Sequence, residues 1–432
     1  MYPLHTLKTN DGAVVEVIDP GLHNHGAGPD FFNSKLKIDE TLWVGNVEIH
    51  DKASDWFLHG HDKDEAYDNV VLHVVGDDDM PVVTHSGRIV KQMQMDVPSQ
   101  VAMNYERLMQ EDHLPPCRRV VPELSPLMMH SWMSALQAER LEQKTEAIMK
   151  RVKERNGSWE EAFFATVARN FGFGVNGDAF EAWASTLSLQ SVAHHRDDIF
   201  QIEAMFMGQA GLLNADAMPM SHRAEAEGDE YLAKLRREFT YLSHKFGLSV
   251  MDYSLWKYLR LRPQNFPHIR ISQLANLYHE RRASLSQLAD CQSLKDAYEL
   301  FQTHVTSYWE THYMFGCESR RQAKRLSKQS ADGLIINTAV PILFAYGRYK
   351  RDEQMVDRAL SLLEELKAED NSITRQWREC GIEVKSAADS QALVQLKSIY
   401  CDHRNCLRCR IGYEYIRRNG WFVKEERAGE GK

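Results

Sequence analysis

Several features that mark particular protein classes are scarce in this chain of 432 residues. It has only 13 Pro and 24 Gly, which excludes collagen-like and proline-rich disordered classes. Its most apolar stretch, 333–347, includes Asn337 and Pro341 and is shorter than the roughly 20 residues that a membrane-spanning helix needs. We therefore expect this stretch to be a buried helix, and we expect no membrane partner.

Positive charge and a targeting segment are also lacking. The 52 Lys and Arg against 61 Asp and Glu leave a net charge of −9, which argues against coating nucleic acid or anionic membranes by bulk charge. Residues 1–5 show no basic region followed by an apolar run, so we expect a cytoplasmic protein. Seven Cys in such a protein do not predict a disulfide framework.

What the chain does have is the composition of a globular protein with two or three domains. Apolar residues make up 43% and charged residues 26% of it. The first hundred residues contain short β-branched runs separated by Gly, Pro, Asn and Asp, which predicts a sheet. The expected strands cover 13–18, 35–38, 42–50, 70–75 and 88–95.

From about Pro98 the apolar residues recur at helical spacing. Ser158 is a plausible N-cap for one of these helices. The sequence thus predicts an α+β protein: a mixed β-sheet domain over 1–98, a helical domain over 99–370 and a helical, cysteine-containing segment over 371–432.

Three residues in the predicted sheet form a candidate catalytic set. Glu48 and His50 lie at i and i+2 of one strand and therefore share a face, and Asp30 at the start of the preceding strand can lie beside them. Two converging carboxylates are typical of a Mg²⁺ or Mn²⁺ site, and such an ion activates water and stabilises phosphate charge. The plain structural alternative is that Asp30 and Glu48 cap turns or pair with nearby lysines.

This layout resembles the PD-(D/E)XK nuclease superfamily, in which an Asp near a strand start is followed by Glu-x-Lys on the next strand. The resemblance implies a PD-(D/E)XK-like sheet and nuclease activity. His50 stands where that family usually has Lys, and imidazole, unlike the lysine ammonium, titrates near neutral pH. His50 is then a metal ligand, a proton shuttle or a cation formed only beside phosphate.

Further histidines surround this motif, among them His59 and His61 in one loop and His73 in a strand. Imidazole-rich sites suit Zn²⁺, Fe or Mn²⁺ better than Mg²⁺ alone. We predict that Asp30, Glu48, His61 and His73 are ligands of this ion.

A second candidate metal site lies near the end of the chain, where Cys401, Cys406 and Cys409 form a C-x4-C-x2-C pattern. Thiolates at this spacing can converge on Zn²⁺ or on an iron–sulfur cluster, with His403 or Cys380 as the fourth ligand. A structural role is expected, because a metal that closes a segment contributes folding free energy without chemistry. The alternative is three free thiols.

Basic side chains interrupt the helical pattern at 258–270, where Arg260, Arg262 and Arg270 lie among Tyr and Phe. Arginine with aromatic neighbours can hold phosphate and stacked bases, so these three are candidate substrate-binding residues. The alternative is a loop in which Arg–carboxylate pairs anchor two helices.

Motifs along nearly the whole chain also resemble one family, labelled domain of unknown function 2851 and found largely in Bacteroidetes. They include 28–31, 45–50, 54–56, 72–75, 208–211, 262–267 and 400–412. This resemblance implies no activity.

We expect a metal-dependent nuclease that hydrolyses phosphodiester bonds, with nucleic acid as its partner. The first alternative is a non-catalytic nucleic-acid or protein-binding module with a structural metal site. The second is another metal hydrolase or an oxygen-dependent enzyme that uses His50, His59, His61 and His73. No oligomeric state follows from the sequence.

Overall fold

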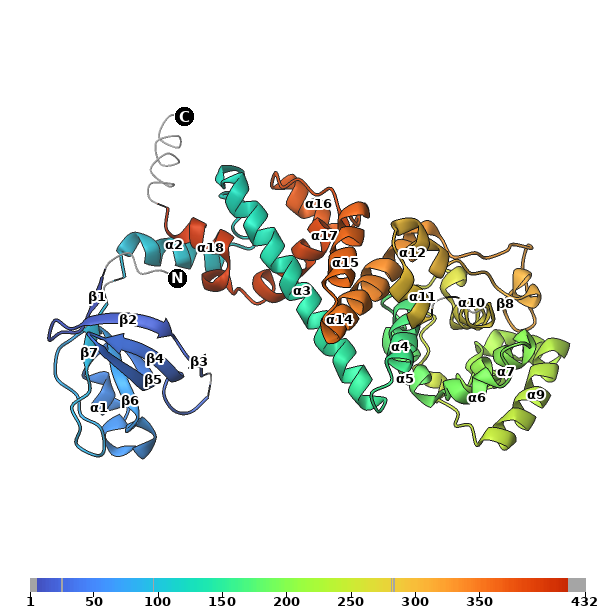
Figure 1. Cartoon of the computed structure of the whole chain (residues 1–432), viewed down its shortest axis with the longest axis horizontal. Helices are drawn as coiled ribbons and strands as arrows, with labels where there is room; N and C mark the ends of the chain where they lie inside the picture. Colours follow the sequence, from blue (N-terminus) through green and yellow to red (C-terminus); the bar gives the residue numbers. More distant parts are fainter. Residues whose placement is uncertain (1–5, 25, 96, 281, 283, 419–432) are drawn as a thin grey trace. The chain divides into compact units, whose positions relative to one another are not determined.

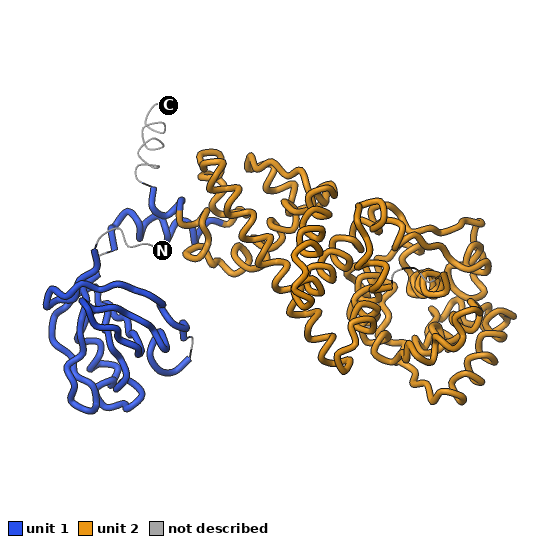
Figure 2. The backbone as a smooth tube through the Cα atoms, viewed as in Figure 1, with its two compact units in different colours: residues 1–111, 414–432 blue, residues 112–413 orange. Residues whose placement is uncertain are grey.

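The computed structural model describes residues 6–24, 26–95, 97–280, 282 and 284–418 (Figure 1). It has a mixed sheet near the N-terminus followed mostly by helices, which confirms the predicted α+β class. The chain divides into two compact units, one formed by 1–111 with 414–432 and the other by 112–413 (Figure 2). The first boundary falls shortly after the predicted one at 98, whereas no unit boundary falls at 370.

The N-terminal unit is built on one sheet whose strands follow the order β1-β2-β4-β5-β6-β7, with β3 paired to β4. Pairing is antiparallel from β1 to β5, whereas β5 with β6 and β6 with β7 are parallel. The strands are β1 Leu7–Lys8, β2 Val14–Asp19, β3 Leu22–His23, β4 Phe31–Ile38, β5 Thr41–Lys52, β6 Val70–Asp77 and β7 Gln92–Gln94.

The crossover between β5 and β6 covers one face of the sheet. It contains the short helix α1 (Asp55–Leu58) and the 3-10 turns η1 (His61–Lys63) and η2 (Glu65–Tyr67). Residues 70–75 of β6 are all buried, as expected for a strand covered on both faces. Two apolar clusters result, one around Leu36 and Val74 and one around Trp56 and Val75.

The helices vary in length from one turn to the 29 residues of α3. They are α2 Ser99–Gln110, α3 Pro126–Glu154, α4 Trp159–Phe171, α5 Gly177–Thr186, α6 Leu189–Ala193, α7 Ile199–Gln209, α8 Arg223–Glu227, α9 Glu230–Phe246, α10 Pro267–His279, α11 Leu285–Asp290, α12 Leu294–Leu300, α13 Lys328–Leu334, α14 Val340–Lys350, α15 Glu353–Glu365, α16 Ser372–Glu379, α17 Ala387–Gln395 and α18 Arg410–Ile416.

Shorter elements connect these helices. They are the 3-10 turns η3 Val121–Glu123, η4 Ala215–Ala217, η5 Met220–His222, η6 Tyr253–Leu255, η7 Pro263–Asn265, η8 Ser307–Glu310 and η11 Cys406–Arg408, the π-helical segments η9 Ile335–Ala339 and η10 Leu396–Cys401, and the strands β8 His312–Met314 and β9 Cys317–Glu318.

Local signals in the helical unit act as predicted. The Ser158 hydroxyl accepts a hydrogen bond from the Glu161 N–H at 3.2 Å and so caps α4. The apolar stretch 333–347 forms the end of α13, the π-helical turn η9 and most of α14, and it lies mainly in the core of this unit. Among the described residues, no helix is both long enough and apolar enough to span a bilayer.

Candidate metal centre

β5 carries two of the predicted site residues on one face. Glu48 is buried, with 6% of its surface exposed, and the side chain of His50 is 7% exposed, whereas Ile49 between them is 44% exposed. Burial alternates in this way because successive side chains of a β-strand point to opposite faces of the sheet. The parallel partner strand β6 places His73 opposite Glu48.

Asp30 lies directly before β4 and is joined to β5 by two reciprocal hydrogen bonds. The Asp30 N–H donates to Glu48 Oε2 at 3.0 Å, and the Ile49 N–H donates to Asp30 Oδ2 at 2.9 Å. One carboxylate oxygen of each acid is therefore engaged by a backbone amide. Asp30 fixes the backbone and the carboxylate of Glu48, while Glu48 Oε1 faces the histidines.

Two imidazoles lie next to that second oxygen of Glu48, and a third contacts one of them. Its Oε1 lies 3.5 Å from His50 Nε2 and 3.4 Å from His61 Nε2. His59 Nδ1 is 3.1 Å from His50 Nε2. One ring nitrogen from each of His50, His59 and His61 lies within 4.8 Å of the other two, and no other group of three such ligands is found in the part of the chain that the structure describes.

His73 lies behind this group rather than in it. Its Nε2 is 2.8 Å from His50 Nδ1, and the residue is fully buried. One of these two nitrogens carries the proton, so the contact couples the tautomer of His50 to that of His73, and His50 Nε2 faces Glu48. His73, predicted as a ligand, therefore lies where it can orient one.

Aromatic packing holds the histidines in place. The ring of Tyr67 stacks on His61 with centroids 3.8 Å apart, and the ring of Trp56 lies 5.4 Å from His61 and 5.1 Å from His73. Trp56 is itself fixed, because its indole N–H donates to the Val83 carbonyl at 2.9 Å. Trp56 belongs to the motif 54–56 but was not expected at the site, and neither was Tyr67; only proximity to the histidine loop could have suggested them.

Burial shapes the charges of the site. It raises the pKa of Glu48 to about 7, an effect increased by the charge of Asp30 and opposed by the hydrogen bond from the Asp30 backbone. Burial also lowers the pKa of His61 to about 4 and that of His73 to about 3, and burial together with His59 lowers the pKa of His50. At neutral pH these three imidazoles are neutral, which is the form that binds metal.

The residues present fit a divalent cation. His61 Nε2 is buried and has no hydrogen-bond partner, which is costly unless another group satisfies it. Three ring nitrogens with one carboxylate oxygen form a donor set that suits Zn²⁺, Fe²⁺ or Mn²⁺ better than Mg²⁺. The structure brings His50, His59 and His61 together and places Glu48 Oε1 next to His50 and His61.

The predicted substrate-binding arginines lie in the helical unit and do not form one surface. Arg260 and Arg262 are exposed, whereas Arg270 on α10 is buried. The Arg270 guanidinium donates to Gln273 at 2.8 Å and to Asn265 at 2.6 Å, and it lies over the Phe173 ring. Arg270 thus links η7 to α10 through two amide side chains.

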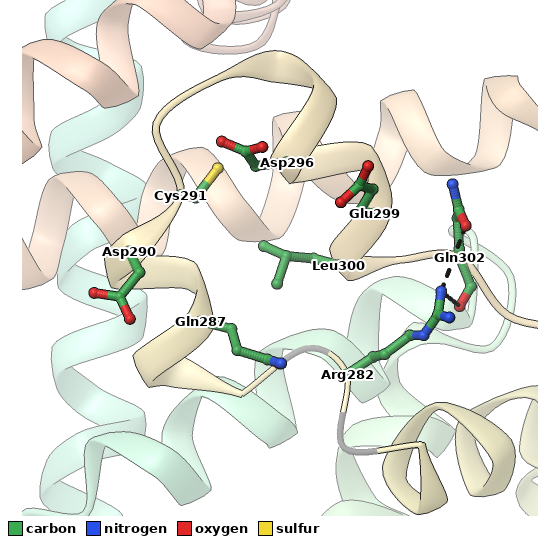
Figure 3. Close-up of a pocket in the computed structure, with 8 residues that line it drawn as sticks. All are labelled: Arg282, Gln287, Asp290, Cys291, Asp296, Glu299, Leu300 and Gln302. Carbon is green, nitrogen blue, oxygen red and sulfur yellow. Dashed lines mark hydrogen bonds between the residues drawn. The ribbon is translucent and has the colours of Figure 1, made fainter.

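A polar pocket in the helical unit contains none of the predicted residues (Figure 3). Its acidic groups come from α11 and α12, and the Asp296 carboxylate accepts hydrogen bonds from the N–H groups of Gln292 and Ser293. Asp296 is therefore used to cap α12. The three-histidine group of the N-terminal unit is therefore the better candidate for a functional site, because its ring nitrogens lie close enough together to bind one metal ion.

Comparison with known proteins gives a family but no activity. Residues 1–372 match the family described as "Protein of unknown function (DUF2851)". No curated protein and no solved structure matches the chain.

Proposed function

Because the chain belongs to the DUF2851 family, whose description assigns no activity, we propose from the site itself that it is a metal-dependent hydrolase of phosphodiesters. One observation carries this proposal: His50, His59, His61 and Glu48 Oε1 converge from β5 and the crossover that follows it. A divalent ion bound there would lower the pKa of a water molecule and stabilise charge on a phosphoryl oxygen.

The choice of a phosphodiester is supported by the order of the acidic motif along the sheet. Asp30 directly precedes β4, and Glu48-x-His50 follows on the neighbouring strand β5, which is the layout that motivated the nuclease prediction. In this proposal Glu48, His50, His59 and His61 are metal ligands. Asp30 and His73 are positioning residues, because one fixes Glu48 and the other fixes His50.

Charge favours a small diester over a nucleic-acid polymer. Residues 1–111 hold 19 Asp and Glu but only eight Lys and Arg. A long polyanion would be repelled by this excess except at the metal itself, since polymer binding depends on neutralised phosphates. We therefore propose a small phosphodiester as the substrate ahead of a nucleic-acid polymer.

The test is hydrolysis of bis(p-nitrophenyl) phosphate by the full chain with Mn²⁺, with plasmid and single-stranded DNA as parallel substrates. His61→Ala is expected to reduce the rate to that of the metal-free protein. His73→Phe, which removes the partner of His50, is expected to lower Mn²⁺ affinity by about 10–100-fold.

The matched control is His85→Ala. His85 belongs to the same unit, its side chain is 46% exposed, and its contact with Asp68 is a long 3.8 Å ion pair. The control should retain wild-type activity. Equal rates in wild type and His61→Ala, or no metal-dependent hydrolysis of any of the three substrates, would contradict the proposal, and binding of DNA without turnover would favour the non-catalytic alternative.

A further inference from the structure

The three cysteines near the end of the chain lie in one compact turn. Cys401 ends the π-helical segment η10, Cys406 begins η11, and Cys409 directly precedes α18. Cys406 and Cys409 are buried, with 6% and 5% of their surfaces exposed. The turn is tight, because a Cβ atom on Gly412 would lie 2.3 Å from the Cys406 carbonyl oxygen, so only glycine fits there.

This turn is attached to the first half of α3. The Arg410 guanidinium donates to the Ser131 hydroxyl at 2.8 Å, and the Tyr400 hydroxyl donates to the Glu139 carboxylate at 2.9 Å. The rings of Trp132 and Tyr400 pack edge to face with centroids 5.3 Å apart. These contacts bring the turn to the segment of chain that leads into α3.

A fourth cysteine lies in that segment. Cys117 is 5% exposed and comes shortly before η3 and α3. The thiols of Cys409, Cys401 and Cys406 lie close enough to Cys117 for their charges to act on it. The fold therefore gathers four thiols from two distant parts of the sequence.

Neither fourth ligand expected from the sequence fits as well. His403 is exposed to solvent. The pKa of Cys380 is raised by burial and shifted by Arg118 and Glu379, and not by the other thiols. Cys117 takes the place that we had predicted for one of them.

Donors surround the sulfur of Cys409 as they would surround a thiolate. The backbone N–H groups of Gly412 and Ile411 and the indole N–H of Trp132 are directed at this sulfur. The Trp132 Nε1 is buried and has no conventional hydrogen-bond partner. N–H donors directed at a ligand sulfur are a usual outer shell of thiolate-bound metal centres.

The distances between the four sulfur atoms distinguish a site for a single metal ion from a site for an iron–sulfur cluster. Four sulfurs 2.3 Å from one Zn²⁺ ion would lie about 3.8 Å from each other in a tetrahedron. The histidine group is the only set of three or more ligand atoms within 4.8 Å of one another among the described residues, so no three of these sulfurs are that close. A cubane cluster, in which each thiolate binds a different iron, holds its ligands further apart.

We propose that Cys117, Cys401, Cys406 and Cys409 bind a [4Fe–4S] cluster that fastens the C-terminal turn to the start of α3. The cluster is structural: it closes a long loop of chain and contributes to folding, as bound metal does when the unfolded chain holds no site. This assignment is independent of the proposed hydrolase function, because its ligands lie in the other unit.

The test uses the full chain purified without oxygen. Iron and acid-labile sulfide are measured together with the visible absorption and the electron paramagnetic resonance spectrum after reduction. We expect about four iron atoms and about four sulfides per chain, as a [4Fe–4S] cluster contains. Cys117→Ser should lose the cluster and have a lower melting temperature. Cys380→Ser should retain the cluster and the melting temperature of the wild type.

Two results would overturn the assignment. One zinc atom per chain without sulfide would replace the cluster by a single ion, and neither metal nor sulfide would remove the site. A Cys117→Ser protein that retains full iron and sulfide would exclude Cys117 as a ligand. If Cys117→Ser does not fold, the iron and sulfide content of the wild type still decides between a cluster, a single ion and no metal site.

Discussion

Glu48 is the residue whose ionisation most directly controls the candidate site. Burial raises its pKa to about 7, so the metal-free fold holds it protonated between pH 4.5 and 7, where the same group in the unfolded chain is ionised. Its contribution to folding stability therefore falls as the pH rises through this window. A bound cation reverses this preference, because it stabilises the carboxylate.

Mn²⁺ affinity should consequently depend on pH through Glu48. We expect displacement of its proton to contribute about a tenfold rise in affinity per pH unit up to about pH 7 and no rise above it. Mn²⁺ is used because it prefers oxygen and imidazole to thiolate. Calorimetric titrations over this pH range measure the slope, and Glu48→Gln should bind more weakly and with a smaller slope. The same slope in Glu48→Gln would contradict this role.

At the residue scale, local periodicity made part of the site predictable. Glu48 and His50 share a face because a strand repeats every two residues, and that rule needs no knowledge of the fold. His73 also lies on a predicted strand, yet its place behind His50 depends on the pairing of β6 with β5. The stacking of Tyr67 on His61 depends on how the crossover folds back, which no local pattern encodes.

At the scale of elements, the close pairing of β5 with β6 positions the whole group. Gly45 makes this approach possible, because a Cβ atom there would lie 2.4 Å from Val71 Cγ1 and 2.6 Å from the Asn69 carbonyl oxygen. Neither neighbour can yield without moving β6. The strands themselves were predictable from β-branched runs and turn residues, whereas the parallel pairing was not.

Gly45→Ala should therefore loosen the site without touching a ligand. We expect a loss of about 1–3 kcal/mol in the free energy of unfolding of the N-terminal unit, the usual cost of overpacking, together with weaker Mn²⁺ binding. Gly26→Ala is the control, because the nearest atom to its added Cβ is Asn24 Oδ1 at 3.6 Å. Chemical denaturation and calorimetry measure the two effects. A Gly45→Ala protein as stable as Gly26→Ala would show that β6 can move.

At the scale of the whole molecule, charge is distributed unevenly between the two parts of the sequence. Residues 1–111 hold 19 acidic and eight basic residues, whereas 112–432 hold 42 acidic and 44 basic residues. Residues 1–111 carry a net negative charge that repels polyanions, and residues 112–432 are too close to neutral to attract them by net charge. The net charge was predictable from composition, whereas the approach of Cys117 to Cys401 depends on how the chain folds.

Nucleic-acid binding by the full chain should accordingly be weak. At 0.15 M salt we expect a dissociation constant no tighter than about 10⁻⁵ M for a fluorescent single-stranded oligonucleotide, within the range of non-specific binding. Fluorescence anisotropy at several salt concentrations measures it. Submicromolar binding that weakens steeply with salt would show a cationic surface that this charge distribution does not predict.

We propose that Glu48, His50, His59 and His61 hold one divalent ion. The number of Mn²⁺ ions bound per chain at saturation tests this metal site most directly. Equilibrium dialysis of the metal-free protein, followed by elemental analysis, provides that number. We expect one bound ion per chain for the wild type and for His85→Ala, and none for His61→Ala. Equal occupancy in His61→Ala and the wild type, or no binding by the wild type, would contradict it.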